Sequence, residues 1–516
     1  MNADSSPAAP RPGTGTGTAA GSRDNPRRWW ALAALVVSVL VLGFDVTILN
    51  VALPTMAADL GATTGQLQWI VDAFLVVFAA LMLPAGLLGD RFGRRLMLIA
   101  GLLVLLAGSL LGVLAGSPGE VIAARTVMGV GAAFVAPLAV AVLPALFGPE
   151  ERGKAVAAVT AGLAAGMPLG PLIGGWLLDH YWWGSVFLVN VPLVALGTAA
   201  CLLLLPETRD RNTPRVDALS GLFTVTGLAA LVYGLIEGPG RGWDDPRVSG
   251  ALALSVPLLA GLVLRERRRE QPMLDLKLLA DRAFRWNALT ATLITLVLTG
   301  LLFLLPQYLQ TVLGYDAFGT GLRLMPMMAG LLVAARASQP LVARFGARGM
   351  VVTGLVLLAF ASFLAASTTV ESGYMPTAVW LSVTGLGVGL ALVPAMDAAL
   401  GALPPDVSGR GSGLLMTLRQ TGGAIGVALL GSVLAQTYAG RVDTAGLPAA
   451  AAEAARESVM SAHRVAELGG GPALAASADR AFVDGMVLVM ALSGAVALLA
   501  ALLAAVLLPR GAAPPA

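Results

Sequence analysis

Residues 66–95 read QLQWIVDAFLVVFAALMLPAGLLGDRFGRR, and this stretch decides the class of fold. The run 66–89 has a single ionisable side chain, Asp72, and is long enough to cross the roughly 30 Å hydrocarbon core of a bilayer as a helix. Arg91, Arg94 and Arg95 follow at once. Because short cytoplasmic loops are rich in Lys and Arg, the stretch predicts a transmembrane helix that ends at the inner face of a membrane.

Similar runs occur along the whole chain. It has 516 residues, of which 57% are hydrophobic and 12% charged, and its mean hydropathy is +0.81. Soluble domains average about 25% charged residues, so the composition excludes a soluble enzyme, a nucleic-acid binder and a disordered scaffold. Backbone polar groups in lipid must be satisfied within each segment, so the runs are predicted to be helices. We count fourteen, at 29–50, 66–89, 96–116, 119–147, 154–178, 185–205, 218–237, 248–265, 286–311, 318–343, 349–370, 377–403, 410–437 and 481–508.

The basic residues give the orientation. Most of the 33 Lys and Arg residues lie in the loops and tails that share a side with the N-terminus. We therefore expect a multi-pass protein of the inner (plasma) membrane with both termini in the cytoplasm, and no nucleic-acid partner. One cysteine, Cys201, and two histidines argue against a metal site. No phosphate-binding loop of the Walker A type occurs, so an ion gradient is the expected energy source, with no cofactor.

The second half of the chain repeats features of the first. RFGRR at 91–95 follows the second run, and RFGAR at 344–348 follows the tenth. Gly129-Val130-Gly131 in the fourth run pairs with Gly387-Val388-Gly389 in the twelfth, and Arg152-Gly153 with Arg410-Gly411. The pattern predicts two six-helix halves with two helices inserted between them. In transporters built from such repeats the substrate site lies between the halves, near the middle of the membrane.

The predicted organisation follows from these runs. It comprises a disordered cytoplasmic tail (1–28), an N-terminal six-helix bundle (29–205), a linker with two extra helices (206–285), a C-terminal bundle (286–508) with a long outer segment (438–480), and a cytoplasmic tail (509–516). Within the outer segment, AAAAEAARESVMSAHRVAEL predicts a short helix, which would either cap an outer vestibule or serve as a linker.

Several motifs resemble the major facilitator superfamily. GLLGDRFGRR (86–95) resembles its signature between spans two and three, and GLAAGMPLGPLIGG (162–175) resembles the span-five motif of its exporters. DVTILNVALP (45–54) resembles the span-one motif of the fourteen-span drug:proton antiporters of the EmrB/QacA type. Three further motifs match the same family: Arg125 with Gly129 and Gly131, WIVD at 69–72, and RQTGG at 419–423. The resemblance extends from about 29 to 508 and implies proton-driven export of lipophilic, often cationic or antibiotic-like compounds by a monomer, without enzymatic activity.

Charged residues within the runs are the candidate binding site. A carboxylate within a membrane span is costly and is a functional hypothesis by default. Asp45, Asp72 and Arg125 are predicted at similar depths on the outer side of the N-terminal half, where they would form a cluster for protons or a substrate cation. Asp397 lies nearer the cytoplasm, and a pair with Arg336 is a further hypothesis. The alternatives are solvation at the interface for the acids and a structural ion pair for Arg125.

Two more groups are predicted to govern movement. The resemblance implies that the loop with Gly89, Asp90, Arg91, Gly93, Arg94 and Arg95 latches the halves at the cytoplasmic face. In the second half Ala343 precedes Arg344, so that copy lacks the acid. Gly162, Gly166, Gly170 and Gly174 form a bare stripe, and with Pro171 they predict a close-packed hinge between the halves, the alternative being ordinary helix packing.

The remaining candidates are less specific. Arg419 requires a partner within its span, and Gln420 follows it in the same motif. Trp69 and Phe74 are expected to stack on a flat cation, with an aromatic belt as the alternative for Trp69. A proton-coupled uptake symporter stays open as an alternative function. A lipid-modifying membrane enzyme and an ion channel fit the sequence less well, because the two histidines lie in outer loops and the acids are scattered.

Overall fold

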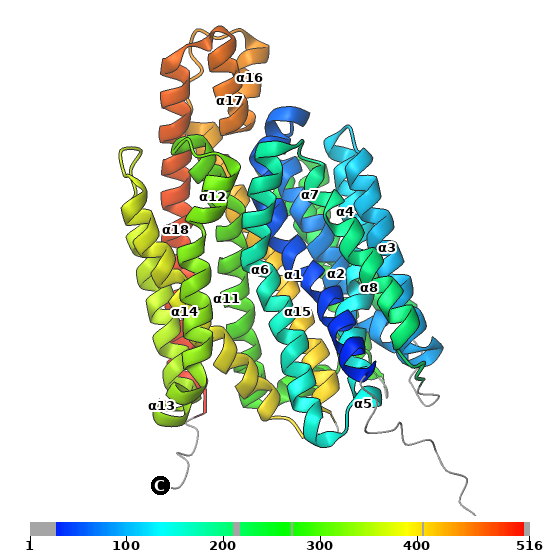
Figure 1. Ribbon diagram of the computed structural model, residues 1–516. Helices are drawn as coiled ribbons and strands as arrows, with labels where there is room; N and C mark the ends of the chain where they lie inside the picture. The colour runs from blue at the N-terminus through cyan, green and yellow to red at the C-terminus, as the bar shows by residue number, and fades with distance from the viewer. Residues whose placement is uncertain (1–26, 210–216, 270–271, 405–406, 510–516) are drawn as a thin grey trace, which may run out of the picture.

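The protein is an all-helical bundle in a computed structural model that describes residues 27–209, 217–269, 272–404 and 407–509 (Figure 1). The predicted tail 1–26 and the end of the chain, 510–516, lie outside the described residues. The first half contains α1 (Arg27–Leu60), α2 (Thr64–Phe92), α3 (Arg94–Leu114), α4 (Pro118–Ala141), α5 (Leu143–Leu146), α6 (Pro149–His180), α7 (Ser185–Leu188) and α8 (Asn190–Leu204).

The remaining helices complete the bundle. Two long helices follow the first half, α9 (Ala218–Arg241) and α10 (Pro246–Arg268). The second half has η1 (Leu276–Ala280), α11 (Arg282–Gln307), η2 (Tyr308–Val312), α12 (Ala317–Arg323), α13 (Met325–Ala365), α14 (Tyr374–Gly401), α15 (Ser408–Arg441), α16 (Ala449–Glu457), α17 (Val459–Val465), η3 (Ala466–Gly470) and α18 (Pro472–Leu507).

Thirteen helices of the described residues are long and apolar enough to cross a membrane. The predicted count of fourteen is therefore not reproduced. The difference lies in the segment Ala317–Ala365, which contains two of the predicted runs. Gly346 interrupts α13 with φ 77° and ψ 154°, in the region that only glycine adopts easily. Both ends of this segment lie at the upper end of the molecule in Figure 1, so the chain descends and returns through Gly346.

Local sequence signals set several helix starts. The Thr63 hydroxyl accepts from the Gln66 backbone N–H while the Gln66 side chain accepts from the Thr63 N–H, which is a capping box at α2. Ser117 caps α4 directly before Pro118, and Asp281 caps α11. These caps satisfy N–H groups that a helix start leaves without partners. They therefore set the residues at which α2 and α4 begin at the upper end and α11 begins at the lower end.

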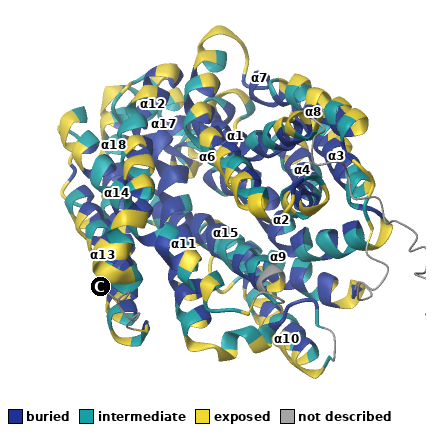
Figure 2. Cartoon of the chain, turned by 60° about the horizontal axis from the view of Figure 1, so that its bottom comes forward, coloured by how far each residue is buried: buried dark blue, intermediate teal, exposed yellow. Residues whose placement is uncertain are grey.

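The inserted helices lie at the side of the bundle. α9 packs against α2 of the first half and α15 of the second, and α10 packs on the outside of α9 (Figure 2). The insertion therefore covers one edge of the contact between the halves, which we call the seam. At the upper end in Figure 1, residues 442–471, here called the strap, contain α16 and α17.

Glycine contacts establish how the two halves correspond. A Cβ on Gly131 would meet the backbone of Gly101 and Leu105 in α3, and a Cβ on Gly387 would meet the backbone of Gly354 and Leu358 in α13. Gly131 therefore corresponds to Gly387, and the predicted pairing of Gly131 with Gly389 is wrong by two residues. Glycines alternate from 385 to 389, so the sequence pattern alone fits two registers, and only the packing separates them.

Candidate functional site

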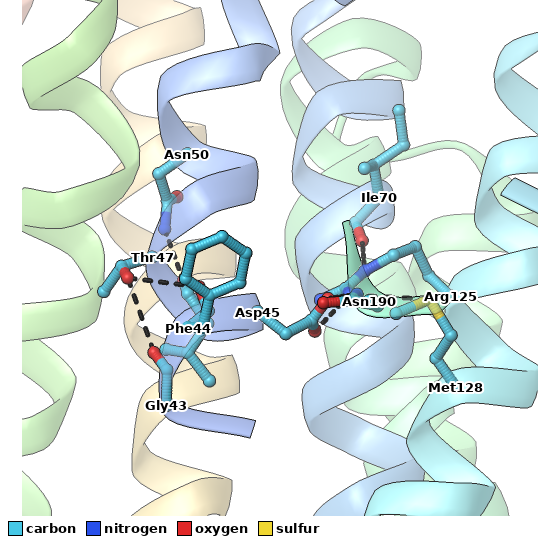
Figure 3. A network of polar contacts seen from close by, with 10 residues as sticks. Gly43, Phe44, Asp45, Thr47, Asn50, Ile70, Arg125, Met128 and Asn190 are labelled. Carbon is cyan, nitrogen blue, oxygen red and sulfur yellow. Dashed lines mark hydrogen bonds and ion pairs between the residues drawn. The ribbon is translucent and has the colours of Figure 1, made fainter. Parts of the chain in front are cut away.

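A buried ion pair joins α1 and α4 within the first half. Arg125 Nη1 lies 2.5 Å from Asp45 Oδ2, and each side chain is only 2% exposed. Arg125 Nε donates to the Ile70 carbonyl at 3.1 Å, and Asn190 Nδ2 donates to Asp45 Oδ1 at 3.3 Å (Figure 3). The guanidinium also lies over the Phe74 ring, 4.3 Å from its centroid. The predicted association of Asp45 with Arg125 is thus present, and both charges are compensated.

Asn190 is a member of this network that the sequence did not reveal. It opens α8 and is fully buried. The only available signal was an amide within the apolar run 185–205, and its distance in the sequence from Asp45 hid the contact. Phe74, predicted as a stacking partner for a substrate, instead lies against Arg125.

Asp72 is buried and has no such support. Neither of its carboxylate oxygens has a hydrogen-bond partner among the described residues. It is two residues from both Ile70 and Phe74, the residues of α2 that contact Arg125, and successive helical residues turn by about 100°. Asp72 therefore lies on a different side of α2, so the predicted three-residue cluster forms only as the Asp45–Arg125 pair.

The side of α2 with Asp72 faces the second half. Gln68, one turn earlier on the same side, donates to the carbonyls of Val427 and Ala428 in α15 at 3.1 and 3.0 Å. Further down, a Cβ on Gly413 of α15 would meet the Leu83 side chain. These two contacts establish an antiparallel register between α2 and α15. By helix geometry in that register, Asp72 lies beside the part of α15 between them and towards α9, which Gly65 of the same side meets at Ile236.

A small cavity lies beside the ion pair. Its volume is about 20 Å³, which is room for about one water molecule. The first half contributes Arg125 and Phe74 to its wall, together with Asn50, whose Oδ1 is buried without a partner. The second half contributes Thr299, Leu302 and Val427. The site of the ion pair therefore opens onto the seam rather than into the interior of one bundle.

The second half has apolar residues where the first has the ion pair. Gly129 and Gly385 correspond through the packing described above, so Arg125 corresponds to Leu381. Gly166 packs on the Leu40 carbonyl as Gly426 packs on that of Leu296. Asp45 comes as many residues after Leu40 as Leu301 comes after Leu296, so Asp45 corresponds to Leu301. Both leucines are buried.

The loop predicted to latch the halves is bound within its own half. Asp90 Oδ1 pairs with Arg94 Nε at 2.7 Å, and Arg94 Nη1 donates to the Ala141 carbonyl of α4 at 2.9 Å. Arg95 Nη2 donates to the Leu202 carbonyl of α8. Gly93 turns the chain with φ 125°. Gly89 abuts Leu138, and Arg91 lies over the neighbouring Phe92 ring. Among the described parts of the chain, the contacts of this loop therefore stay within the first half and form no latch between the halves.

The glycine stripe also packs inside the first half. Gly162, Gly166, Gly170 and Gly174 all face α1, where a Cβ on Gly166 would lie 2.5 Å from the Leu40 carbonyl oxygen. α6 stays helical through Pro171, so the predicted hinge at the seam is not present as a break. Two residues of α6 face α12 at the seam: Pro171, whose carbonyl a Cβ on Gly321 would meet, and Gly175, which faces Ala317 and Phe318. Gly175 directly follows Gly174 of the stripe, so the side of α6 at the seam is turned by about 100° from the stripe.

The other predicted site residues lie apart from the ion pair. Asp397 is exposed and accepts from Gln339 Nε2 at 3.4 Å, and the described residues contain no ion pair between it and Arg336. Trp69 lies 6.3 Å from the Tyr233 ring of α9. Arg419 donates to Thr295 Oγ1 at 3.3 Å and lies 3.1 Å from Met396 Sδ, without an acid among the described residues. Gln420 follows Arg419 and, by helix geometry from Gly413, lies on the side of α15 that faces α2.

Hydrogen bonds between the two halves lie towards the upper end. Gln310 Nε2 of η2 donates to the Val51 carbonyl of α1 at 2.9 Å, and the Ala317 and Phe318 N–H groups donate to Asp179 at 3.2 and 3.1 Å. The strap adds two: Thr64 donates to the Glu457 carbonyl at 2.7 Å, and Arg464 donates to the Ala58 carbonyl. With the Gln68 contacts, these close the upper end of the seam, and the described residues show no such bond at its lower end.

Two six-helix halves around a buried charged site define a multi-pass membrane transporter. The chain belongs to the Major Facilitator Superfamily, whose model matches residues 35–427. It is 32% identical over 499 residues to the tetracenomycin C resistance and export protein of Streptomyces glaucescens, and the match covers 94% of this chain and 92% of that protein. It is 35% identical over 423 residues to the puromycin resistance protein of Streptomyces alboniger, covering 79% and 82%.

A solved structure agrees in fold. The inward-facing, unoccupied form of a bacterial homologue of the human lysosomal transporter Spinster superposes with a TM-score of 0.68 at 18% identity. The match covers 95% of this chain and 100% of that one. At this identity the likeness concerns the fold alone, and it extends over both halves.

Proposed function

We propose that the protein exports small lipophilic molecules, cations and antibiotics among them, in exchange for protons by alternating access at the seam. Export is supported by the relatives named for antibiotic resistance and export. The two helices α9 and α10, inserted between the halves, support membership of the EmrB/QacA-type drug:proton antiporters. Proton coupling rests on one observation, the buried Asp72 carboxylate without a partner.

We infer different roles for the two acids from their surroundings. An anionic carboxylate buried without donors or a counter-ion is costly, whereas its neutral form is tolerated. Asp45 has Arg125 and Asn190 to stabilise its charge. Asp72 has neither. Asp72 is therefore the proton carrier in this proposal, and Asp45 is the partner of an arginine that cannot release its own proton.

The conformation with a closed upper end is the starting point of the proposed exchange. The lower end, where α1 begins, is the cytoplasmic face by the distribution of basic residues. In this conformation the seam is therefore closed to the outside. A substrate that enters from the cytoplasm separates α2 from α15 and lets water reach Asp72, whose proton leaves to the cytoplasm. Opening of the upper end then releases the substrate outside and lets Asp72 take up a proton there.

The test is substrate-driven proton movement in inverted membrane vesicles with an acidified interior. Ethidium, tetraphenylphosphonium and puromycin are the probes, and a fluorescent pH indicator is the readout. In the wild type each transported probe discharges the acid interior. Asp72→Asn is expected to lower this discharge at least tenfold at equal protein level, because the variant cannot carry a proton. Asp244→Asn, in an exposed upper loop, is the matched control and keeps it.

Two outcomes would contradict the proposal. A substrate-dependent discharge that persists unchanged in Asp72→Asn would remove this residue from the coupling step. Movement of the probe in the same direction as the protons would identify a symporter instead of an exporter.

A further inference from the structure

The lower end of the inserted helices has a groove lined by arginines. Arg265, Arg268 and Arg269 surround an open volume of about 320 Å³, with Gly261 and Leu264 as its apolar wall. All five residues belong to the last two turns of α10 or follow it directly. The groove is far from the ion pair and plays no part in the exchange proposed above.

The guanidinium groups are held in place by one acid of α9. Asp217, the N-cap of that helix, has a side chain only 5% exposed. Its Oδ2 lies 2.8 Å from Arg265 Nε and 3.2 Å from Arg269 Nε. These hydrogen bonds and charges hold the pKa of the Asp217 carboxyl well below its usual range. Asp217 is therefore a permanent anion that orients two of the three arginines.

The groove keeps an excess of positive charge. Arg268 forms no ion pair with any residue that the structure describes. Glu266 lies on the buried side of α10, where its Oε2 accepts from the Leu274 N–H at 2.9 Å. Among the residues that the structure describes, one acid thus faces three guanidiniums in the groove, and an anion of one or two charges would complete it.

The apolar side of the groove continues onto the surface of α10. This helix packs on α9 and η1, and its other side is uncovered (Figure 2). Leu254, Val256 and Leu264 are each more than half exposed on it. An uncovered apolar helix side in a membrane protein faces acyl chains. The ligand that fits is therefore an amphiphile, with chains along α10 and a phosphate between the arginines.

We propose that this groove binds the phosphate headgroup of an anionic phospholipid from the leaflet at the lower end. Basic clusters at the ends of membrane helices attract anionic headgroups, at about 1 kcal/mol, or roughly a fivefold change in affinity, for each Lys or Arg. The chains distinguish a lipid from free phosphate, which matches only the polar part of the groove. The proposal is independent of proton coupling and of the substrate.

The test uses the purified full-length protein in a neutral detergent, with lipid removed. Phosphatidylglycerol, phosphatidylcholine and inorganic phosphate are titrated separately, and the thermal unfolding midpoint and the lipid adducts in native mass spectrometry are measured. Phosphatidylglycerol is expected to raise the midpoint and to form adducts of defined number. Phosphatidylcholine and inorganic phosphate at equal concentration are not.

The matched variants are Arg268→Gln and Arg267→Gln, which remove the same charge one residue apart. Arg267 does not line the groove. Arg268→Gln is expected to weaken the phosphatidylglycerol effect about fivefold, with Arg268→Lys retaining most of it and Arg267→Gln close to wild type. The lipid-free midpoint of each variant separates loss of binding from loss of folding.

Three results would overturn the proposal. Equal losses in Arg267→Gln and Arg268→Gln would mean that only diffuse surface charge attracts the lipid. Equal binding of phosphatidylcholine would remove the role of the anionic headgroup. Reproduction of the full effect by inorganic phosphate would show a free-anion site without a role for the chains.

Discussion

At the scale of single residues, the first half is distinguished by the buried Asp45–Arg125 ion pair. Removing one member of a buried ion pair leaves an uncompensated charge, which costs roughly 3–5 kcal/mol, whereas replacing both members with apolar residues is often neutral. The second half already shows the apolar solution, with Leu301 and Leu381 at the corresponding positions. The pair is therefore better explained by function than by stability.

This contrast gives the first prediction. Asp45→Leu alone is expected to lower the free energy of unfolding by about 3–5 kcal/mol, and Asp45→Leu with Arg125→Leu to recover most of it, because no isolated charge remains. Transport is expected to be absent in both. The measurement is thermal unfolding in detergent beside vesicle transport. A double variant as unstable as the single one would show that the pair is structural.

Candidate site residues were predictable from the sequence because charged side chains are rare within membrane spans. Asp45, Asp72 and Arg125 stand out from the sequence because charges in apolar runs are uncommon. The sequence did not show on which side of its helix, relative to the neighbouring helices, each of these side chains lies. Asp72 lies on the side of α2 that turns away from Arg125, and Asn190 approaches Asp45 from α8, because these relations depend on helix rotation and on which helices become neighbours.

At the scale of elements, α6 shows how a proline is accommodated in a membrane helix. Pro171 has no N–H, so the Met167 carbonyl one turn earlier loses its usual donor. Thr47 of α1 donates its hydroxyl to that carbonyl at 2.9 Å. The glycine stripe brings the two helices close enough for this bond, since Gly170 lies directly against Thr47.

The second prediction is a double-mutant cycle on this contact. Thr47→Val in the wild type is expected to cost about 1 kcal/mol, because a buried carbonyl loses its donor. In a Pro171→Ala background the cost is expected to be much smaller, because an alanine at this position would supply the missing N–H. Chemical or thermal unfolding of the four proteins gives the coupling energy. Equal costs in both backgrounds would refute the account.

The strap gives a pH-dependent prediction. His463 Nε2 lies 2.8 Å from Asp479 Oδ1 of α18. Its hydrogen bond to Asp479 and the charges of Asp479 and Glu467 raise the pKa of His463 above its ordinary value, against an opposing effect of burial. A raised folded-state pKa stabilises the strap below about pH 6.5, the unfolded value, and this stability is lost as pH rises through the folded pKa.

Hydrogen exchange of the strap checks this expectation. After correction for intrinsic rates, protection of residues 449–470 is expected to fall between about pH 6.5 and 8.5 in the wild type. His463→Gln, which cannot titrate, is expected to show no such fall, and Asp479→Asn to show a smaller one. The same pH dependence in His463→Gln would assign it to another group.

At the scale of the whole molecule, the architecture was largely predictable and the contacts between halves were not. Long apolar runs, loop charges and repeated motifs specify helices, orientation and two halves, because each is a local property of the chain. The break of the predicted outer helix at Ser458 is a local departure. The latch at 89–95 was placed at the seam but is bound within the first half. In α6 the glycine stripe packs on α1, whereas Pro171 meets α12 at the seam, because sequence motifs do not state the partner of a helix face.

The most direct test of the central claim measures protons released when substrate binds to the purified protein. In weakly buffered detergent solution, a pH indicator reports release on addition of a transported probe such as ethidium. The account predicts about one proton released per bound substrate in the wild type, and none in Asp72→Asn, although that variant still binds the probe. Release of the same size in Asp72→Asn would contradict the claim that the buried, partnerless carboxyl at the seam carries the proton.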